Sequence, residues 1–153
     1  MRIVARLLVL LPLLWVEGVW AEACAFKNYD LRSTADADAL GQTGCTTIVG
    51  NLQLFETRGV SLNIDALSNI IIVHGDLRIY RADTLTNLDG LANLTRVGGG
   101  LSIQDNAALT NLNGLASLTS VGGYLSIRDS YISNLNGLAN LTSVGGALIL
   151  YRT

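Results

Sequence analysis

Asp105 and Asp129 stand 24 residues apart, at equivalent places of a repeated sequence. On neighbouring turns of a repeat protein, such a pair of carboxylates can hold a calcium ion or serve as the acid and base of a polysaccharide-cleaving enzyme. Arg81 and Arg152 belong to the same column of the repeat and would neutralise the pair as a ladder of solvated surface charges. We favour the surface ladder, because a narrow, regular coil offers no deep pocket for a substrate. The chain is therefore predicted to be no enzyme and to hold no metal or cofactor.

The only histidine, His74, takes the place of the first glycine in the Val-Gly-Gly bends of the later repeats. A zinc site would need further histidine or cysteine ligands, and a general base would need a serine or free cysteine in a known context. The sequence around His74 offers neither, so we interpret it as a bend residue.

Three near-identical phrases organise the chain and position these side chains. They begin at Leu77, Leu101 and Leu125, with a fourth start at Leu148, at spacings of 24, 24 and 23 residues. A period of this length predicts a solenoid. Each phrase runs from Leu-x-Ile through Asn-Leu-Asp/Asn-Gly-Leu to Val-Gly-Gly. Leu-x-Ile is typical of a strand with its leucine and isoleucine inward, and we expect three short extended segments in each coil, joined by tight bends.

The first full rung, from Leu52, is less regular and carries one extra residue between Thr57 and Asn63. Rungs are thus expected at 52–76, 77–100, 101–124 and 125–147. In the rung 101–124, the predicted core side chains are Leu101, Ile103, Leu109, Leu112, Leu115, Leu118 and Val121. A lone rung cannot bury enough apolar surface to fold, so the rungs must stack.

Residues 1–21 have the pattern of a secretory signal peptide, with Arg2 and Arg6 before an apolar run and small residues before the cut. The alternative is an uncleaved N-terminal anchor. Cleavage after Ala21 leaves eight basic and eleven acidic side chains, a net charge of −3. Without a run of like charge, the mature chain is predicted to bind no nucleic acid and not to insert into a membrane. We expect a secreted or cell-surface protein, in the periplasm or wall if the source is bacterial.

Residues 24–47 are predicted to cap the solenoid, because its first rung would otherwise expose its core and strand edges. After a short strand, Ser33–Asp36 forms a capping box that begins a short helix, and Gly41 is expected to stop it. Cys24 and Cys45 are an even pair in an oxidising compartment and predict a disulfide, worth about 3 kcal/mol. The alternative, a lipid-anchored Cys24, is disfavoured by the acidic Glu22 among the residues before it. Residues 48–153 then form the β-helix repeats, with an open C-terminal end.

These phrases resemble the receptor L domain, the leucine-rich-repeat-like β-helix of insulin and epidermal growth factor receptors. The resemblance is carried by Leu101-Ser-Ile-Gln-Asp-Asn106, Leu109-Thr-Asn-Leu-Asn-Gly-Leu115 and Leu118-Thr-Ser-Val-Gly-Gly123, preceded by a cap between Cys24 and Cys45. It is nearest to secreted and cell-surface versions from microbes and fungi, and it runs from Cys24 to the C-terminus. It implies an all-β, right-handed β-helix with a short N-terminal capping helix. The asparagine that such rungs usually carry after the strand stands only at Asn106.

In that family the outward face of the main strands meets a protein ligand. Here this face is expected to carry Gln53, Arg78, Ser102 and Ser126 in one column and Phe55, Tyr80, Gln104, Arg128 and Tyr151 in the next. Exposed aromatic and arginine side chains are enriched in binding hot spots. We therefore predict a binding surface at Phe55, Arg78, Tyr80, Gln104, Arg128 and Tyr151. The alternative is that isolated aromatics merely suit the pleat of a strand.

Two further sets of asparagines recur. Asn63, Asn87, Asn111 and Asn134 form one column, in which stacked amides are expected to hydrogen-bond to the rungs above and below as a structural ladder. Asn93 and Asn140 begin glycosylation sequons on one face, which matter if the source is eukaryotic.

Together these patterns favour a secreted or cell-surface binding and scaffold module that presents a strand face to protein or glycan ligands. The alternative is a structural repeat of a larger cell-wall or surface protein. A polysaccharide-degrading enzyme is the least favoured class.

Overall fold

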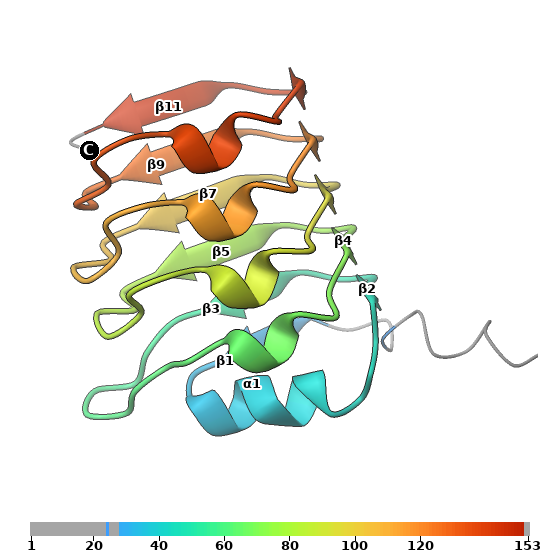
Figure 1. Cartoon of the computed structure of the whole chain (residues 1–153), viewed down its shortest axis with the longest axis vertical. Helices are drawn as coiled ribbons and strands as arrows, with labels where there is room; N and C mark the ends of the chain where they lie inside the picture. The colour runs from blue at the N-terminus through green and yellow to red at the C-terminus, as the bar shows by residue number, and fades with distance from the viewer. Residues whose placement is uncertain (1–23, 25–27, 152–153) are drawn as a thin grey trace, which may run out of the picture.

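The structure, a computed structural model, describes residue 24 and residues 28–151. The chain winds through a stack of similar coils, and two parallel sheets run along the stack (Figure 1). The order is β1-β3-β5-β7-β9-β11 in the six-stranded sheet and β10-β8-β6-β4-β2 in the five-stranded sheet. Neighbouring strands in each sheet therefore come from consecutive coils, which makes the fold solenoid-like, as the repeat predicts.

The elements repeat in a fixed sequence. The six-stranded sheet contains β1 (Tyr29–Leu31), β3 (Leu52–Leu54), β5 (Leu77–Tyr80), β7 (Leu101–Gln104), β9 (Leu125–Arg128) and β11 (Leu148–Tyr151). The five-stranded sheet contains β2 (Thr47–Ile48), β4 (Ile72–Val73), β6 (Arg96–Val97), β8 (Ser120–Val121) and β10 (Ser143–Val144). Four 3-10 turns lie between them: η1 (Asp65–Leu67), η2 (Asp89–Leu91), η3 (Asn113–Leu115) and η4 (Asn136–Leu138).

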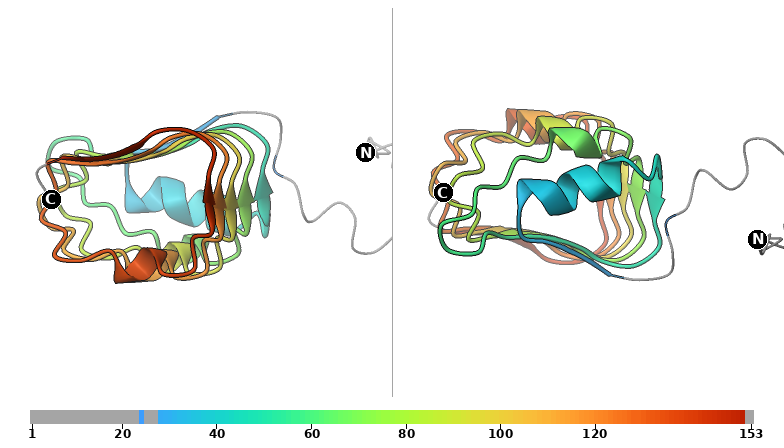
Figure 2. Two further views of the ribbon diagram at one scale, coloured as in Figure 1. Left: turned by 90° about the horizontal axis from the view of Figure 1, so that it is seen from above. Right: turned by 90° about the horizontal axis from the view of Figure 1, so that it is seen from below.

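The third side of each coil is a 3-10 turn, so the prediction of three extended segments is wrong (Figure 2). The reason lies in the repeated asparagine. The side-chain oxygen of Asn111 accepts a hydrogen bond from the backbone nitrogen of Asn113 at 3.0 Å, and Asn63, Asn87 and Asn134 do the same in their own coils. Such an Asx turn bends the chain two residues after the asparagine.

The inward side chains stack in register along the coil axis. Leu77 pairs with Leu101 and Leu101 with Leu125, and the isoleucines two residues later pair likewise. All seven predicted core residues of the rung 101–124 are buried. This part of the prediction is confirmed. The register matters most in the strand, because a one-residue slip of β7 would turn Leu101 and Ile103 outward.

The helix α1 (Thr34–Gly41) lies against the first coil at one end of the stack (Figures 1 and 2). Its N-cap is Ser33, whose side chain accepts a hydrogen bond from the backbone nitrogen of Asp36 at 3.2 Å. A disulfide joins Cys24 to Cys45, with their Cα atoms 5.5 Å apart. It fastens the chain before β1 to the chain after α1.

Gly41 does not stop the helix in the expected way. It is the last residue of α1, and the left-handed conformation lies three residues later at Gly44, with φ +68°. A Cβ on Gly41 would overlap the carbonyl oxygen of Ala66 in the first coil. The lack of a side chain at Gly41 therefore allows α1 to pack closely against the first coil.

The predicted signal peptide, residues 1–21, lies outside the described residues. Within the described part of the chain, no helix is long and apolar enough to cross a membrane. At the other end of the stack, Leu148 and Leu150 of β11 are 60% and 45% exposed, whereas Leu125 below Leu148 is 2% exposed.

Candidate functional site

The outward side of the six-stranded sheet, which we call the strand face, carries two neighbouring columns of side chains. The register pairs Tyr80 with Gln104, Gln104 with Arg128, and Arg128 with Tyr151. Phe55 follows β3 directly and continues this column toward the N-terminus. The structure thus places the residues predicted for binding along one line, except Arg78, which stands in the adjacent column with Ser102 and Ser126.

Aromatic contacts organise the N-terminal part of the strand face. The rings of Phe55 and Tyr80 are stacked, with centroids 4.9 Å apart and planes inclined by 16°. The guanidinium carbon of Arg32 lies 5.2 Å from the centroid of Phe55. Stacked rings and a cation above a ring each stabilise the column. Both partners contact the π-face of Phe55, so a ligand would meet mainly the edge of this ring.

Arg78 is held in place by Asp76, because its guanidinium donates a hydrogen bond to the Asp76 carboxylate at 2.8 Å. Desolvation lowers the pKa of Arg78, but the interactions with Asp76 and Tyr124 outweigh it and raise this pKa above the ordinary value. A preorganised guanidinium loses little conformational freedom when it binds an acceptor.

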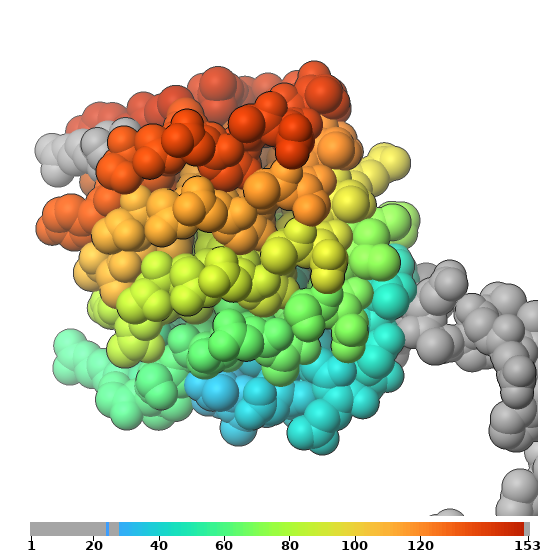
Figure 3. Space-filling view, viewed as in Figure 1, coloured from blue at the N-terminus to red at the C-terminus, as the bar shows by residue number. Residues whose placement is uncertain are grey.

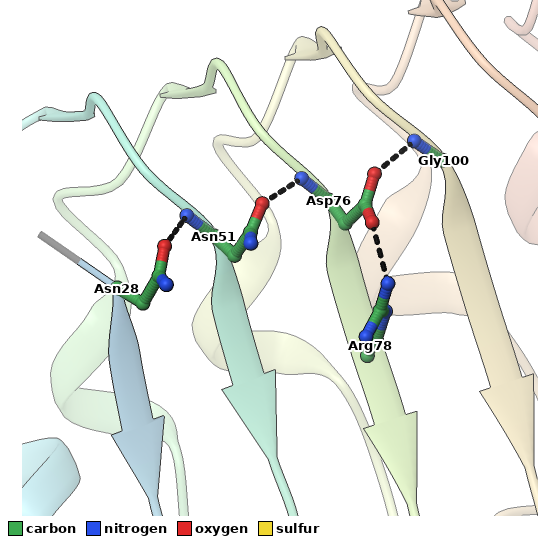
Figure 4. Close-up of polar contacts among 5 residues, drawn as sticks. All are labelled: Asn28, Asn51, Asp76, Arg78 and Gly100. Carbon is green, nitrogen blue, oxygen red and sulfur yellow. Dashed lines mark hydrogen bonds and ion pairs between the residues drawn. The ribbon is translucent and has the colours of Figure 1, made fainter.

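Asp76 also belongs to a ladder of hydrogen bonds between coils, which the sequence analysis missed (Figure 4). The side-chain oxygen of Asn28 accepts a hydrogen bond from the backbone nitrogen of Asn51 at 3.0 Å. In the same way, the side chain of Asn51 accepts from the backbone nitrogen of Asp76 at 2.7 Å, and the side chain of Asp76 accepts from the backbone nitrogen of Gly100 at 2.8 Å. The ladder lies just before each main strand and fixes where the strand begins. The signal was present as the column Asn28, Asn51 and Asp76, but it does not extend into the regular repeats, where Gly100 has no side chain.

A groove lies where β3, β5 and β7 end, and we call it the strand-end groove. It has a volume of about 660 Å³, and its polar lining includes Glu56, Arg58, Arg81, Asp83, Thr84 and Asp105. One rim is the loop 57–61 of the first rung, which protrudes at the lower left of the space-filling view (Figure 3). The extra residue of this rung, noted in the sequence, therefore builds a feature that the later rungs lack.

Hydrogen bonds centred on Thr84 hold this rim in place. Glu56 accepts from the backbone nitrogen of Thr84 at 2.8 Å and from its hydroxyl, and that hydroxyl accepts from the backbone nitrogen of Leu62 at 3.1 Å. The backbone nitrogen of Val60 donates to the carbonyl oxygen of Thr57 at 2.9 Å, and this turn closes the tip of the loop. The two ends of the loop are thus fixed to the next coil.

Asp105 and Asp129, the pair considered for calcium or catalysis, lie at the ends of β7 and β9. Both adopt the left-handed backbone conformation, with φ +54° and +45°, as does Arg81 with φ +50°. Aspartate tolerates this conformation better than most residues, which gives the pair a structural reason to be there. Among the residues that the structure describes, no group of three or more histidines, cysteines or carboxylates could hold a metal ion. Arg152, expected in the same column, lies outside the described residues.

The remaining predicted positions are at turns. The hydrogen bonds found for the side chains of Asn63, Asn87, Asn111 and Asn134 lie within each rung and do not link one rung to the next. The sequon asparagines, in contrast, do link one rung to the next. Asn93 donates its side-chain nitrogen to the carbonyl of Ser68 at 2.8 Å, and Asn140 donates to Ala116 at 2.7 Å. His74 is exposed at its bend.

A stack of parallel coils with leucine columns inside and an ordered strand face outside defines a leucine-rich-repeat-like solenoid. The family model of the receptor L domain matches residues 44–110, and this segment of the chain belongs to that family. The resemblance stated from the sequence is thereby confirmed, over a shorter range than Cys24 to the C-terminus. No curated protein matches the chain. The match covers strands β2 to β7 and names a binding domain, not a family of enzymes. The microbial or fungal type stays a prediction.

Proposed function

We propose that the chain is a secreted or cell-surface binding module that presents its strand face to a protein partner. The observation that carries this proposal is the ordered outward column of Phe55, Tyr80, Gln104 and Arg128 on a sheet whose backbone is fixed by pairing on both sides. A receptor L domain is a ligand-binding module, which supports the same role here.

The chemistry of the strand face favours a protein over a glycan as the partner at this surface. A sugar that stacks on an aromatic side chain does so through the ring face, whereas the ring face of Phe55 is in contact with Tyr80 and Arg32. Arg128 is exposed, and within the described residues it has no carboxylate within 4.0 Å. Gln104 separates Arg128 from Tyr80 in this column, and such a line of an arginine and aromatic side chains suits a partner that supplies a carboxylate and, at a distance from it, an apolar side chain.

We further propose a handedness for the coil, a cap for its first rung and a signal peptide before it. We take the coil to be right-handed, because parallel strands joined by a crossover almost always are. The helix α1 serves as the cap of the first coil within a segment 24–47, followed by rungs over 48–153. Residues 1–21 direct secretion, which agrees with the disulfide between Cys24 and Cys45 and with the extracellular setting of receptor L domains.

The proposal is tested with the full-length chain expressed in a secreting host. The labelled secreted product is screened against purified surface and secreted proteins of the source organism and against a glycan array. Arg128→Ala should weaken binding of a protein hit at least about tenfold, with no change in Tm, because its side chain is exposed. Arg96→Ala, an exposed arginine of the five-stranded sheet, is the control. Hits that bind Arg128→Ala as tightly as the wild type, or binding of glycans alone to the strand face, would contradict the proposal.

A second candidate function is a structural repeat within a larger cell-wall or surface protein. The observation that favours it is the apolar side of β11, where Leu148 and Leu150 are 60% and 45% exposed and suited to burial under a further rung. Genomic sequence downstream of Thr153 would decide. Further rungs or a wall anchor would favour this function over a small secreted binder.

A further inference from the structure

The strand-end groove combines charges of both signs that do not neutralise one another. Arg58 and Arg81 line it together with Asp83 and Asp105. The ion pairs of the described residues are Arg32–Asp30 and Arg78–Asp76, so none of these four groups has an opposite charge within 4.0 Å. Asp105 accepts one hydrogen bond from the side-chain nitrogen of Gln104 at 3.1 Å. The donors of the two arginines and the remaining acceptor capacity of the two aspartates lie side by side and are not spent on one another.

The balance of these groups indicates the charge of a ligand. The lining includes two arginines and three carboxylates with Glu56, a net charge of −1. An anionic ligand would be attracted by the arginines but repelled by Asp83 and Asp105, and a cation would meet the reverse. Glu56 keeps its negative charge, but its carboxylate accepts two hydrogen bonds from Thr84 and is less available to a ligand. A ligand without net charge meets neither repulsion.

We propose that the strand-end groove binds a neutral oligosaccharide, with Arg58 and Arg81 donating to its hydroxyl oxygens and Asp83 and Asp105 accepting from its hydroxyl hydrogens. A sugar hydroxyl both donates and accepts, so neighbouring hydroxyls pair with an arginine and a carboxylate at once. The volume of about 660 Å³ lies in the range of ligand sites. This site goes beyond the proposed function, whose partner is a protein on the strand face.

The lining disfavours a peptide that binds through apolar side chains. Apart from Gly59, all the residues that line the groove are charged or are threonines, so an apolar side chain of a peptide would find no pocket. Recognition thus rests on hydrogen bonds to hydroxyl groups, for which a site rejects analogues that lack them.

The test follows the side-chain Nε–Hε resonances of Arg58 and Arg81 in the full-length chain secreted with its own leader. The probes are neutral cellohexaose, laminarihexaose, mannohexaose and N-acetylchitohexaose, with hexagalacturonate and a heparin hexasaccharide as acidic comparators. The test variant is the double substitution Arg58→Ala/Asp83→Ala, which removes one charge of each sign from exposed side chains. The matched control is Arg96→Ala/Asp38→Ala, which makes the same charge change at exposed positions away from the groove.

We expect at least one neutral hexasaccharide to shift both arginine resonances, with an affinity that changes little as salt is raised. The test variant should bind it at least about tenfold more weakly, as expected when hydrogen bonds to charged groups are lost, and the control should bind it as the wild type does. Absence of shifts with every neutral sugar, shifts with the acidic sugars only, or full binding by the test variant would overturn the inference. Arg128→Ala should leave sugar binding intact, so failure here and failure of the strand-face proposal are distinguishable.

Discussion

Gly114 lies in η3, where a Cβ would overlap the carbonyl oxygen of Leu88 in the preceding coil. Gly90 and Gly137 stand in the same relation to Ile64 and Leu112. These glycines allow one 3-10 turn to rest directly on the next. We expect Gly114→Ala to lower the free energy of unfolding by about 1–3 kcal/mol, the usual cost of overpacking, measured by urea denaturation.

The control for this substitution is Ala66→Gly. Ala66 occupies the equivalent position of η1, where its neighbour is α1 and Gly41 leaves room for the extra methyl group. Ala66→Gly removes a methyl group without creating a clash, so it should cost less than Gly114→Ala. If Gly114→Ala is as stable as the wild type, the coils must be free to separate, and close stacking is not what holds the turns together.

At the scale of the elements, hydrogen bonds that run between coils set the start of each main strand. Asp76 is the key member, because it accepts from the backbone nitrogen of Gly100 at 2.8 Å and from Arg78 at 2.8 Å (Figure 4). Asp76→Ala should lower the free energy of unfolding by about 1–3 kcal/mol, since it leaves the part-buried N–H of Gly100 without this partner. Hydrogen exchange at the Gly100 amide should speed up in this variant. Asp76→Asn keeps the accepting oxygen, so equally fast exchange in Asp76→Asn would show that the ladder does not protect this amide.

The beginning of α1 should make the N-terminal region sensitive to acid. The backbone N–H of Arg32 and then the hydroxyl of Ser33 hydrogen-bond to Asp36 and hold the pKa of its carboxyl below the ordinary value. Because the folded pKa lies below the unfolded one, this stabilisation is present above the unfolded pKa and is lost as pH falls through the folded pKa. We expect Tm to drop less on acidification in Asp36→Asn than in the wild type, measured by thermal melts over a pH series. Asp38→Asn, an exposed residue of the same helix, should follow the wild type.

At the scale of the whole molecule, the sequence predicts the repeated strands, but neither the conformation of the repeated turns nor the features outside the repeat. The strands β5, β7 and β9 follow from Leu-x-Ile at a fixed period, since only one register buries Leu77, Leu101 and Leu125 together. The 3-10 turns were missed because an Asx turn depends on the direction of one side chain, which periodicity does not reveal. The strand-end groove depends on the contact of Glu56 with Thr84, 28 residues away, which no repeat contains.

Because each coil contacts mainly its neighbours, the stability of the stack should grow with the number of rungs. We expect the chain to accept a second copy of residues 101–124 inserted after Tyr124, with the tyrosine of the first copy changed to glycine. This change is needed because the ring of Tyr124 fills the space beside Gly100, where a Cβ would overlap it. The longer protein should keep its circular dichroism per residue and melt about 2–8 °C higher, if the rung adds about 1 kcal/mol. Insertion of residues 101–112 alone is the control, since half a rung would place the next strand on the wrong side of the coil. A full-rung insertion that unfolds the protein, or a half-rung insertion that is tolerated equally well, would contradict a stack built on leucines in register.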